Sequence, residues 1–297
     1  MNKTAIVFPG QGAQKVGMCF DFYEKFDSVI KIFNSLDASV KEFIFKGPQE
    51  SLNLTINAQP ALFAADLACA TALKEIGVEA DGAAGFSFGE IPALVYCGAI
   101  GLEQGLDFIN FRAKAMQDCA EKNKGGMAAI MGLPAETVVS ICSEINGAYP
   151  ANFNSKNQTV VAFSENAFDD LAAVVGSHKG KIIKLAVNGA FHSPLMNEAA
   201  DKIKIYLEKI KINEAVKPIY SNFTAQVYSS PRDLLARHVN SPVKWRESIE
   251  NMINDGFGTF IEAGPGKTLT GLIQKINSDV KVFNVFDSQS LENFKNR

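Results

Sequence analysis

The sequence GAAGFSFGE, at residues 82–90, joins a short apolar run to a segment of helical character. Its first five residues predict a buried strand, and residues 88–96 predict a helix that begins directly after Ser87. Gly85, Ser87 and Gly89 form the G-x-S-x-G pattern of a nucleophile elbow, whose small neighbours permit a sharp turn that exposes the serine hydroxyl. A serine that only caps the helix fits the same residues, and the motif alone leaves both interpretations open.

The same alternation of strand and helix extends on both sides of this elbow. Residues 4–8 (TAIVF) predict another buried strand, because a Pro-Gly pair stops the apolar run. Residues 59–76 carry an apolar stripe at helical spacing, and residues 194–210 and 258–261 predict a later helix and strand. Alternating strands and helices predict a parallel sheet with helices on both faces.

The middle of the chain follows a different order, strand-helix-strand-strand-helix-strand. The strands are expected at residues 127–131, 150–154, 159–163 and 181–185, and the helices at 134–145 and 165–175. Ser164 is the candidate N-cap of the second helix. This order is the ferredoxin-like pattern. We therefore predict an α/β chain with one subdomain at residues 1–123 and 190–297 and a ferredoxin-like subdomain inserted at residues 124–189.

The composition excludes several classes of protein. There are 29 basic and 32 acidic side chains, a net charge of −3, which argues against bulk binding to nucleic acid or an anionic membrane. No apolar run reaches the roughly 18–20 residues of a membrane helix, and the N-terminus does not resemble a secretory signal. The five cysteines contain no C-x-x-C pair, so we expect neither a zinc cluster nor a disulfide framework in a reduced, cytoplasmic protein.

A serine nucleophile needs a base, and the chain offers three histidines. His178 lies in a polar turn, where a solvated side chain is expected. His192 lies in an irregular segment that enters a helix, from which it reaches a cleft or caps the helix. His238 precedes a proline by four residues and fits either a structural or a functional role.

Two glycine-containing loops fail the tests for nucleotide binding. Residues 10–12 (GQG) would need a glycine where Lys15 stands, and the Walker-like residues 266–268 would need one where Ile261 stands. The first loop still follows a strand at the edge where α/β sheets place ligands. The backbone N–H of Gln11 is therefore a candidate donor to a developing oxyanion, although a simple tight turn fits equally.

Arg112 is one of only five arginines beside 24 lysines, within a helix predicted over residues 102–120. Its helical neighbours are apolar: Phe108, Ile109, Ala115 and Met116. A guanidinium on such a face needs an anion, and its planar fork suits a carboxylate. That carboxylate belongs either to a ligand or to an internal Asp or Glu in a structural ion pair, which the residues alone favour slightly.

Taken together, these segments resemble the malonyl-CoA:acyl carrier protein transacylases. The resemblance covers nearly the whole chain, in the order FPGQGAQ (8–14), QPA (59–61), GFSFGE (85–90), Arg112, GMAAI (126–130), residues 152–160, GAFHSPLM (189–196), SN (221–222), PVKW (242–245) and GPGK (264–267). It implies a hydrolase-like α/β subdomain, interrupted by the ferredoxin-like one, with the active site between them.

The resemblance also assigns catalytic roles to particular residues. By it, Ser87 is the nucleophile that accepts the acyl group and His192 is its general base. The backbone N–H groups of Gln11 and Phe88 form the oxyanion hole. Acyl transfer through a malonyl-serine intermediate is then expected, without a metal or another cofactor.

The same resemblance assigns the substrate and the partner. Arg112 holds the free carboxylate of malonate, with Met116 and Phe191 as further substrate-binding residues. Malonyl-CoA and an acyl carrier protein are the expected partners. Such carriers are typically acidic, and Lys179, Lys181 and Lys184 are candidates for the surface that meets them.

Two positions depart from the family pattern. Phe86 stands where the family usually has His, and we expect it to alter only the pocket wall. His238 stands where most members have a Gln that helps to orient the catalytic histidine. As a candidate orienter, the imidazole of His238 would need the correct tautomer to accept the N–H of that base.

Three other functions fit part of the sequence. A serine esterase would need an acid between Ser87 and His192, for which Asp169 and Asp170 are available. A non-catalytic docking module would not need the Ser-His pair. A free-standing acyltransferase that loads polyketide extender units is not separated from a fatty-acid enzyme by the sequence.

Overall fold

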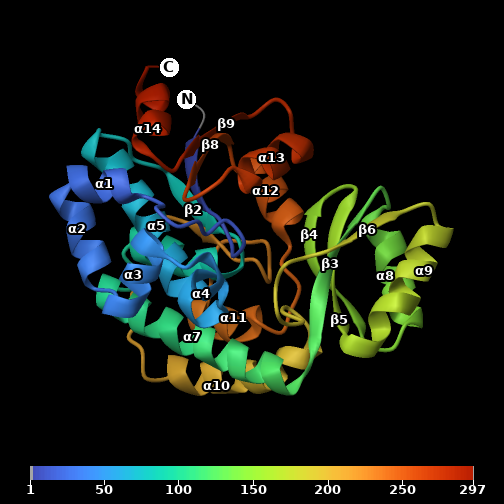
Figure 1. Cartoon of the computed structure of the whole chain (residues 1–297). Helices are drawn as coiled ribbons and strands as arrows, with labels where there is room; N and C mark the ends of the chain where they lie inside the picture. Colours follow the sequence, from blue (N-terminus) through green and yellow to red (C-terminus); the bar gives the residue numbers. More distant parts are fainter. Residues whose placement is uncertain (1–2, 297) are drawn as a thin grey trace.

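The computed structural model describes residues 3–296 and contains two sheets of different kinds. One is a five-stranded parallel sheet and the other is a four-stranded antiparallel sheet, which lie side by side in the molecule (Figure 1). The predicted α/β class with these two units is confirmed. The exact boundaries of the subdomains, at residues 123/124 and 189/190, stay a prediction.

The parallel sheet has the strand order β7-β2-β1-β8-β9. Its strands are β1 (Lys3–Phe8), β2 (Gly82–Gly85), β7 (Ile219–Tyr220), β8 (Phe257–Ala263) and β9 (Lys281–Val285). The strands predicted at residues 4–8, 82–86 and 258–261 are all present. Strands β7 and β9 were not predicted, because the first is only two residues long and the second lies at the edge with its residues half-buried.

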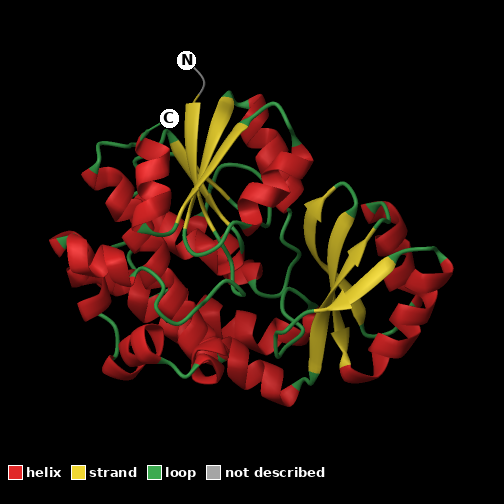
Figure 2. Cartoon of the chain, turned by 45° about the horizontal axis from the view of Figure 1, so that its top comes forward, coloured by secondary structure: helices red, strands yellow, loops and turns green. Residues whose placement is uncertain are grey.

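Helices cover both faces of this sheet, as the alternation predicts (Figure 2). The side chains of β1 show the two faces, since successive residues of a strand point in opposite directions. Ile6 and Phe8 belong to the core that includes α5 (Thr55–Glu75), whereas Ala5 and Val7 pack with α12 (Trp245–Asn254) and α13 (Thr268–Ile276).

The remaining helices of this unit surround that sheet. They are α1 (Phe20–Lys25), α2 (Asp27–Asn34), α3 (Ala38–Lys46), α4 (Gln49–Asn53), α6 (Glu90–Tyr96), α7 (Leu102–Lys122), α10 (Asn197–Leu207), α11 (Pro231–His238) and α14 (Ser288–Lys295).

The antiparallel sheet has the strand order β4-β5-β3-β6 and carries helices on one face only (Figure 2). Its elements are β3 (Gly125–Met131), α8 (Ala135–Glu144), β4 (Ala148–Ser155), β5 (Gln158–Ser164), α9 (Phe168–Ser177) and β6 (Lys181–Lys184). Ala128 and Ile130 pack with those helices, whereas Met127 and Ala129 belong to the core shared with the larger unit. The second face of this sheet therefore looks toward the parallel one.

Three predicted helices begin differently in the structure. Short 3₁₀ turns, at Ser87–Gly89, Glu165–Ala167 and Pro194–Met196, precede α6, α9 and α10. Ser164 occupies the predicted N-cap position before α9, but its side chain makes no capping hydrogen bond. Periodicity does not distinguish a 3₁₀ turn from the first turn of an α-helix, which explains the difference.

Within residues 3–296, no helix is both long and apolar enough to cross a bilayer.

Candidate active site

The turn that carries Ser87 is sterically dependent on its two glycines. Ser87 has φ 53°, in the left-handed region that non-glycine residues seldom adopt. A Cβ on Gly85 would lie 1.9 Å from the carbonyl carbon of Gly89, and one on Gly89 would lie 2.4 Å from the carbonyl oxygen of Phe8. The close crossing of β1, β2 and the start of α6 therefore requires the G-x-S-x-G pattern.

The structure brings Ser87 and His192 into hydrogen-bonding contact across 105 positions of the chain. The Oγ of Ser87 lies 2.7 Å from Nε2 of His192, so the hydroxyl contacts the imidazole instead of capping the helix. The Nδ1 of His192 lies 2.9 Å from the backbone carbonyl oxygen of His238. Because a carbonyl only accepts, Nδ1 carries the proton, and Nε2 is left as the acceptor for the serine proton.

The environment keeps the His192 imidazole neutral. Burial, together with the nearby positive charge of Arg112, lowers its pKa to about 4, although hydrogen bonds to backbone groups oppose the shift. A neutral imidazole at physiological pH is the form that can take a proton.

The structure corrects the role expected for the side chain of His238. The group that accepts the His192 N–H is the backbone carbonyl of His238, and the two rings are 5.5 Å apart between centroids. The His238 ring is buried and turns to Glu90 instead, with Nδ1 3.3 Å from Oε2. The tautomer of His238 is therefore not what orients His192. His178, by contrast, is exposed, as expected.

Two polar residues to which the sequence analysis assigned no role support the turn. Asn222 accepts the Ser87 N–H at its Oδ1 (2.7 Å) and donates from Nδ2 to the carbonyl of Gly85 (2.6 Å). Glu90 accepts the backbone N–H of Asn222 at 2.5 Å. Their partners come from distant segments, so only the burial of these polar side chains reveals them.

Arg112 is buried, with 1% of its surface exposed, and its hydrogen bonds go to neutral groups. Nη1 donates to Oε1 of Gln59 at 2.7 Å, and Nη2 lies 3.5 Å from Oγ of Ser87. Nε is buried without a partner, and no carboxylate in the described part of the chain is within ion-pairing distance. The structural ion pair favoured by the residues alone is therefore wrong.

Burial also lowers the pKa of the Arg112 guanidinium, whereas the negative charge of Glu90 raises it. Since an arginine starts from a very high pKa, the side chain stays cationic at neutral pH. Beside the hydroxyl of Ser87, the site therefore holds a buried positive charge without a direct anionic partner.

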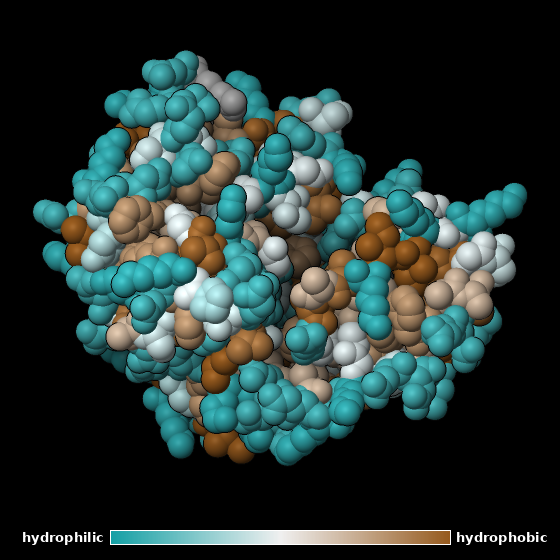
Figure 3. Space-filling view, viewed as in Figure 1, coloured by the Kyte–Doolittle hydropathy of each residue, from teal (hydrophilic) through white to brown (hydrophobic). Residues whose placement is uncertain are grey.

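Ser87, His192 and Gln59 line a cavity of about 270 Å³ between the two sheets, where Figure 3 shows the surface hollowed. Arg112 contacts Ser87 and Gln59 but is not itself one of the lining residues. Its walls include Gln11, Phe88, Met116, Phe191 and Phe86. The N–H of Phe88 lies in the first helical turn, where backbone donors have no intrahelical partner. Phe86 also packs edge-on against Trp245, at 5.5 Å between ring centroids.

The smaller sheet supplies the opposite wall of the cavity. Its lining residues are Met127, Ala129, Asn152, Asn154, Gln158 and Val160. Within residues 3–296, no group of three or more His, Cys, Asp or Glu side chains could hold a metal ion. Asp169 and Asp170, the acids that an esterase would need, are exposed in the first turn of α9 and do not contact His192.

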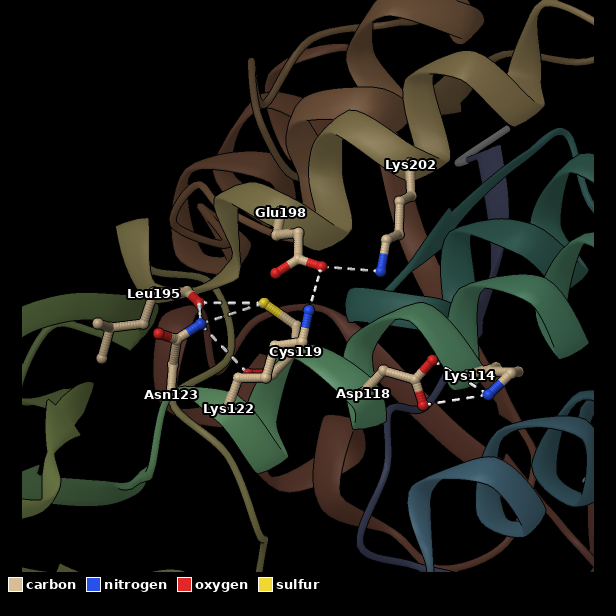
Figure 4. A network of polar contacts seen from close by, with 8 residues as sticks. All are labelled: Lys114, Asp118, Cys119, Lys122, Asn123, Leu195, Glu198 and Lys202. Carbon is tan, nitrogen blue, oxygen red and sulfur yellow. Dashed lines mark hydrogen bonds and ion pairs between the residues drawn. The ribbon is translucent and has the colours of Figure 1, made fainter.

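The segment that follows His192 is fastened to the end of α7, close to the passage into the smaller sheet (Figure 4). Nδ2 of Asn123 and Sγ of Cys119 both reach the carbonyl oxygen of Leu195, at 3.2 and 3.3 Å. Lys122 pairs with Glu198 at 2.7 Å. These contacts hold the start of α10, and with it the backbone near His192, against α7.

The three candidate lysines face different directions. In β6, Lys184 pairs with Ala128 on the helix-covered face, where its ammonium lies over the rings of Phe163 and Phe168. Lys181 and Ile183 lie on the other face, because Ile183 pairs with the cavity-lining Ala129. Lys179 is exposed in the turn before β6.

Comparison with known proteins gives a consistent result. Residues 5–288 match the acyl transferase domain. A malonyl CoA-acyl carrier protein transacylase of Bacillus subtilis (strain 168) is 36% identical over 98% of this chain and 96% of its own length. One from Staphylococcus aureus (strain MRSA252) is 36% identical over 99% of this chain and 98% of its own.

Solved structures agree with these relatives. The malonyl CoA-acyl carrier protein transacylase from Clostridium perfringens has a TM-score of 0.95 and 36% identity, covering 99% of this chain and 96% of that one. A malonyl-transacylase in complex with its type II polyketide acyl carrier protein has a TM-score of 0.94 and 33% identity, covering 99% and 100%.

Proposed function

This chain belongs to the acyl transferase family that includes the malonyl-CoA:acyl carrier protein transacylases, and we propose that it transfers malonyl groups from malonyl-CoA to an acyl carrier protein. The observation that carries this proposal is the buried guanidinium of Arg112, 3.5 Å from Oγ of Ser87 and without a carboxylate partner. Such a group favours an acyl donor that brings its own carboxylate to the nucleophile, as malonyl-CoA does.

In the first half-reaction, Ser87 attacks the thioester carbonyl of malonyl-CoA while Nε2 of His192 takes the hydroxyl proton. The tetrahedral oxyanion accepts hydrogen bonds from the backbone N–H groups of Gln11 and Phe88, and one such donor commonly lowers a barrier by about 2.7–4 kcal/mol. The C–S bond then breaks, His192 returns the proton to the departing thiolate, and CoA leaves malonyl-Ser87 behind.

In the second half-reaction, the phosphopantetheine thiol of the carrier protein loses its proton to His192 and attacks malonyl-Ser87. The serine oxygen leaves with that proton, and malonyl-carrier is released, which is a ping-pong sequence. Water competes with the thiol for the same ester. The apolar walls of the cavity, including Met116 and Phe191, limit that competition.

The carrier protein would approach along the face of β6 that looks into the cleft. Ile183 is 41% exposed there, beside the exposed Lys181 and in register with the cavity-lining Ala129. An apolar side chain flanked by a cation suits an acidic carrier whose prosthetic arm must enter the cavity. Lys184 points to the other face and does not belong to this surface.

A fatty-acid pathway and a cytoplasmic location complete the proposal. The five cysteines are free and buried, which supports a reduced compartment. A second candidate is the loading of polyketide extender units, because the solved complex with a type II polyketide carrier is similar over the whole chain. Rates with malonyl-, methylmalonyl- and acetyl-CoA, measured with carriers of both pathways, separate the two candidates.

The central test is the acyl-enzyme itself. Incubation with malonyl-CoA should add one malonyl group to the peptide that contains Ser87, detected by mass spectrometry, and Ser87→Ala should remove the adduct. A thiol carrier added afterwards should remove it from the wild-type protein. An adduct that forms equally on Ser87→Ala, or none on the wild type, overturns the assignment.

A further inference from the structure

Glu90 is a buried carboxyl group for which the proposed chemistry has no use. It is the first residue of α6, and 1% of its surface is exposed. Its Oε1 accepts the backbone N–H of Asn222 at 2.5 Å, and its Oε2 lies 3.3 Å from Nδ1 of His238. Burying a carboxyl group costs free energy, so the contacts that this group makes need to explain why it is buried here.

The first contact leads to the nucleophile. Asn222 receives the Glu90 contact through its backbone N–H, and its side chain then holds both ends of the sharp turn. Oδ1 accepts the N–H of Ser87, and Nδ2 donates to the carbonyl of Gly85. One oxygen of Glu90 therefore anchors the residue that fixes the left-handed conformation of Ser87.

The second contact leads to the base. His238 is the last residue of α11, and its carbonyl oxygen accepts the Nδ1–H of His192. The next residue, Val239, accepts the backbone N–H of His192 at 2.9 Å. Because Glu90 contacts the ring of His238, it restrains this stretch of backbone beside His192.

We infer that Glu90 is a positioning residue of the acyl transfer proposed above, on which this inference rests. Through Asn222 and His238 it holds Ser87 and His192 at their 2.7 Å spacing. Its charge also tunes how strongly the cleft attracts the carboxylate of a malonyl group. A single buried acid would then serve both the geometry of the reacting pair and the choice of acyl group.

The charges around Glu90 determine how the attraction for the malonyl carboxylate changes with pH. Burial raises the pKa of Glu90 to about 8, although the hydrogen bond from the Asn222 backbone, the nearby Tyr228 hydroxyl and the charge of Arg112 oppose this shift. At pH 7 the carboxyl group is therefore mostly neutral, and Arg112 is free to attract a substrate carboxylate. Above about pH 8 the Glu90 anion competes for that positive charge.

The other titratable groups that face Glu90 do not change charge in this range. Burial lowers the pKa of His238 well below the usual value and that of His192 to about 4, so both rings remain neutral. Burial raises the pKa of the Tyr228 hydroxyl, which stays protonated. Burial lowers the pKa of Arg112 itself to about 9, so its guanidinium stays mostly cationic between pH 6.5 and 8.5, and the larger change of charge in this range is that of Glu90.

His238 suits both protonation states of Glu90. When Oε2 carries a proton, Nδ1 of the imidazole can accept it, and when Glu90 is ionised, a protonated Nδ1 can donate. Nε2 of His238 is buried and has no hydrogen-bond partner within residues 3–296, so no second contact fixes either tautomer. The contact can therefore persist when Glu90 gains or loses its proton.

The test compares the full-length enzyme with Glu90→Gln, which keeps the shape and a hydrogen-bonding oxygen but cannot ionise. The kcat/KM values with malonyl-CoA and acetyl-CoA are measured between pH 6.5 and 8.5. In the wild type, the preference for malonyl-CoA should fall about threefold or more over this range. In Glu90→Gln it should stay constant within about 1.5-fold, with kcat at pH 7 reduced about 3–10-fold.

Two further variants separate positioning from a merely structural role. Glu90→Ala should lower kcat at least tenfold while the KM for malonyl-CoA changes less than threefold. His238→Gln removes the second imidazole but keeps Glu90, so its preference should still fall with pH. Thermal unfolding of each variant identifies one that has not folded, and the comparison then relies on Glu90→Gln.

The outcomes distinguish this inference from the function on which it rests. If the wild type forms no malonyl-Ser87, the proposed function itself fails. If the wild type transfers malonyl groups but its preference is flat with pH, or Glu90→Gln keeps the wild-type profile, only the role of Glu90 is overturned. The same holds if His238→Gln alone abolishes the pH dependence, because the imidazole would then carry the effect.

Discussion

Nη1 of Arg112 donates to the side-chain oxygen of Gln59 at 2.7 Å, so a neutral amide aims the buried guanidinium. Nε2 of the same Gln59 reaches Sδ of Met116 at 3.7 Å, which fixes the orientation of the amide. A carboxylate in place of Gln59 would neutralise the guanidinium and remove its attraction for an anionic acyl group. The amide instead directs the cation without cancelling its charge.

Replacement of this arginine should therefore affect one substrate selectively. Arg112→Ala is expected to lower kcat/KM for malonyl-CoA about 10–150-fold, because the loss of a charged hydrogen-bond partner costs roughly 1.5–3 kcal/mol. The value for acetyl-CoA, which has no second carboxylate, should change much less. Parallel assays of the two thioesters measure the ratio, and equal losses would mean that Arg112 is structural.

The pH dependence of acylation should follow His192. Since burial lowers the pKa of this residue to about 4, the base remains neutral well below the usual range of histidine. The rate of malonyl-Ser87 formation should decline only as the pH approaches 4, which stopped-flow acylation can measure at constant ionic strength. A decline centred near pH 6.5 would show that His192 titrates like a solvated histidine.

The same shift should appear in the pH dependence of folding. The pKa of His192 is lower in the folded state than in the unfolded chain, so the unfolded chain binds a proton first as the pH falls. The free energy of unfolding is therefore unaffected by this residue above about pH 6.5. The free energy of unfolding then decreases as the pH falls toward 4, by no more than about 1.4 kcal/mol per pH unit. Denaturant titrations of the wild type and His192→Gln at pH 7 and 5 should show a smaller pH effect in the variant.

The glycines of the elbow should tolerate no side chain. Gly85→Ala places a Cβ 1.9 Å from a backbone atom of Gly89, where no rotamer can relieve the overlap. We expect a loss of more than about 4 kcal/mol in the free energy of unfolding. Gly271→Ala, in α13 with open space around its Cβ, is the matched control and should add about 0.5–1 kcal/mol. Denaturant unfolding of both variants tests the contrast, and similar stabilities would contradict it.

The proposed carrier surface predicts a difference between two lysines of one strand. Lys181→Glu should raise the KM for the carrier protein about 3–10-fold, since a reversed charge at the rim opposes an acidic partner. Lys184→Glu changes the same charge on the other face of β6 and should have a smaller effect. Formation of malonyl-Ser87 from malonyl-CoA should be unchanged in both. Equal effects on the carrier KM would place its surface elsewhere.

Local patterns in the sequence were sufficient for the class of fold and for most elements near the site. The apolar run before Ser87, the helical stripe of α5 and the strand-helix order at residues 127–185 each depend on neighbours within a few positions, and all are present. The G-x-S-x-G pattern likewise reports a local steric requirement. These features can be predicted because the residues that determine each of them lie in the same short segment of the chain.

Only the tertiary structure decided which groups meet in the cleft. The residues alone slightly favoured an internal ion pair for Arg112, and the resemblance assigned it to the carboxylate of malonate, but its side-chain partner within the protein is Gln59, 53 positions away. The sequence offered the imidazole of His238 as the orienter, but the contact uses its carbonyl oxygen, which every residue type possesses. Glu90 and Asn222 lie in segments that carry the resemblance, but they were given no role, because a buried hydrogen bond between distant segments leaves no periodic signal in either one. Side-chain identity fixes what a residue can donate or accept, whereas the packing of the two sheets determines which partner it finds.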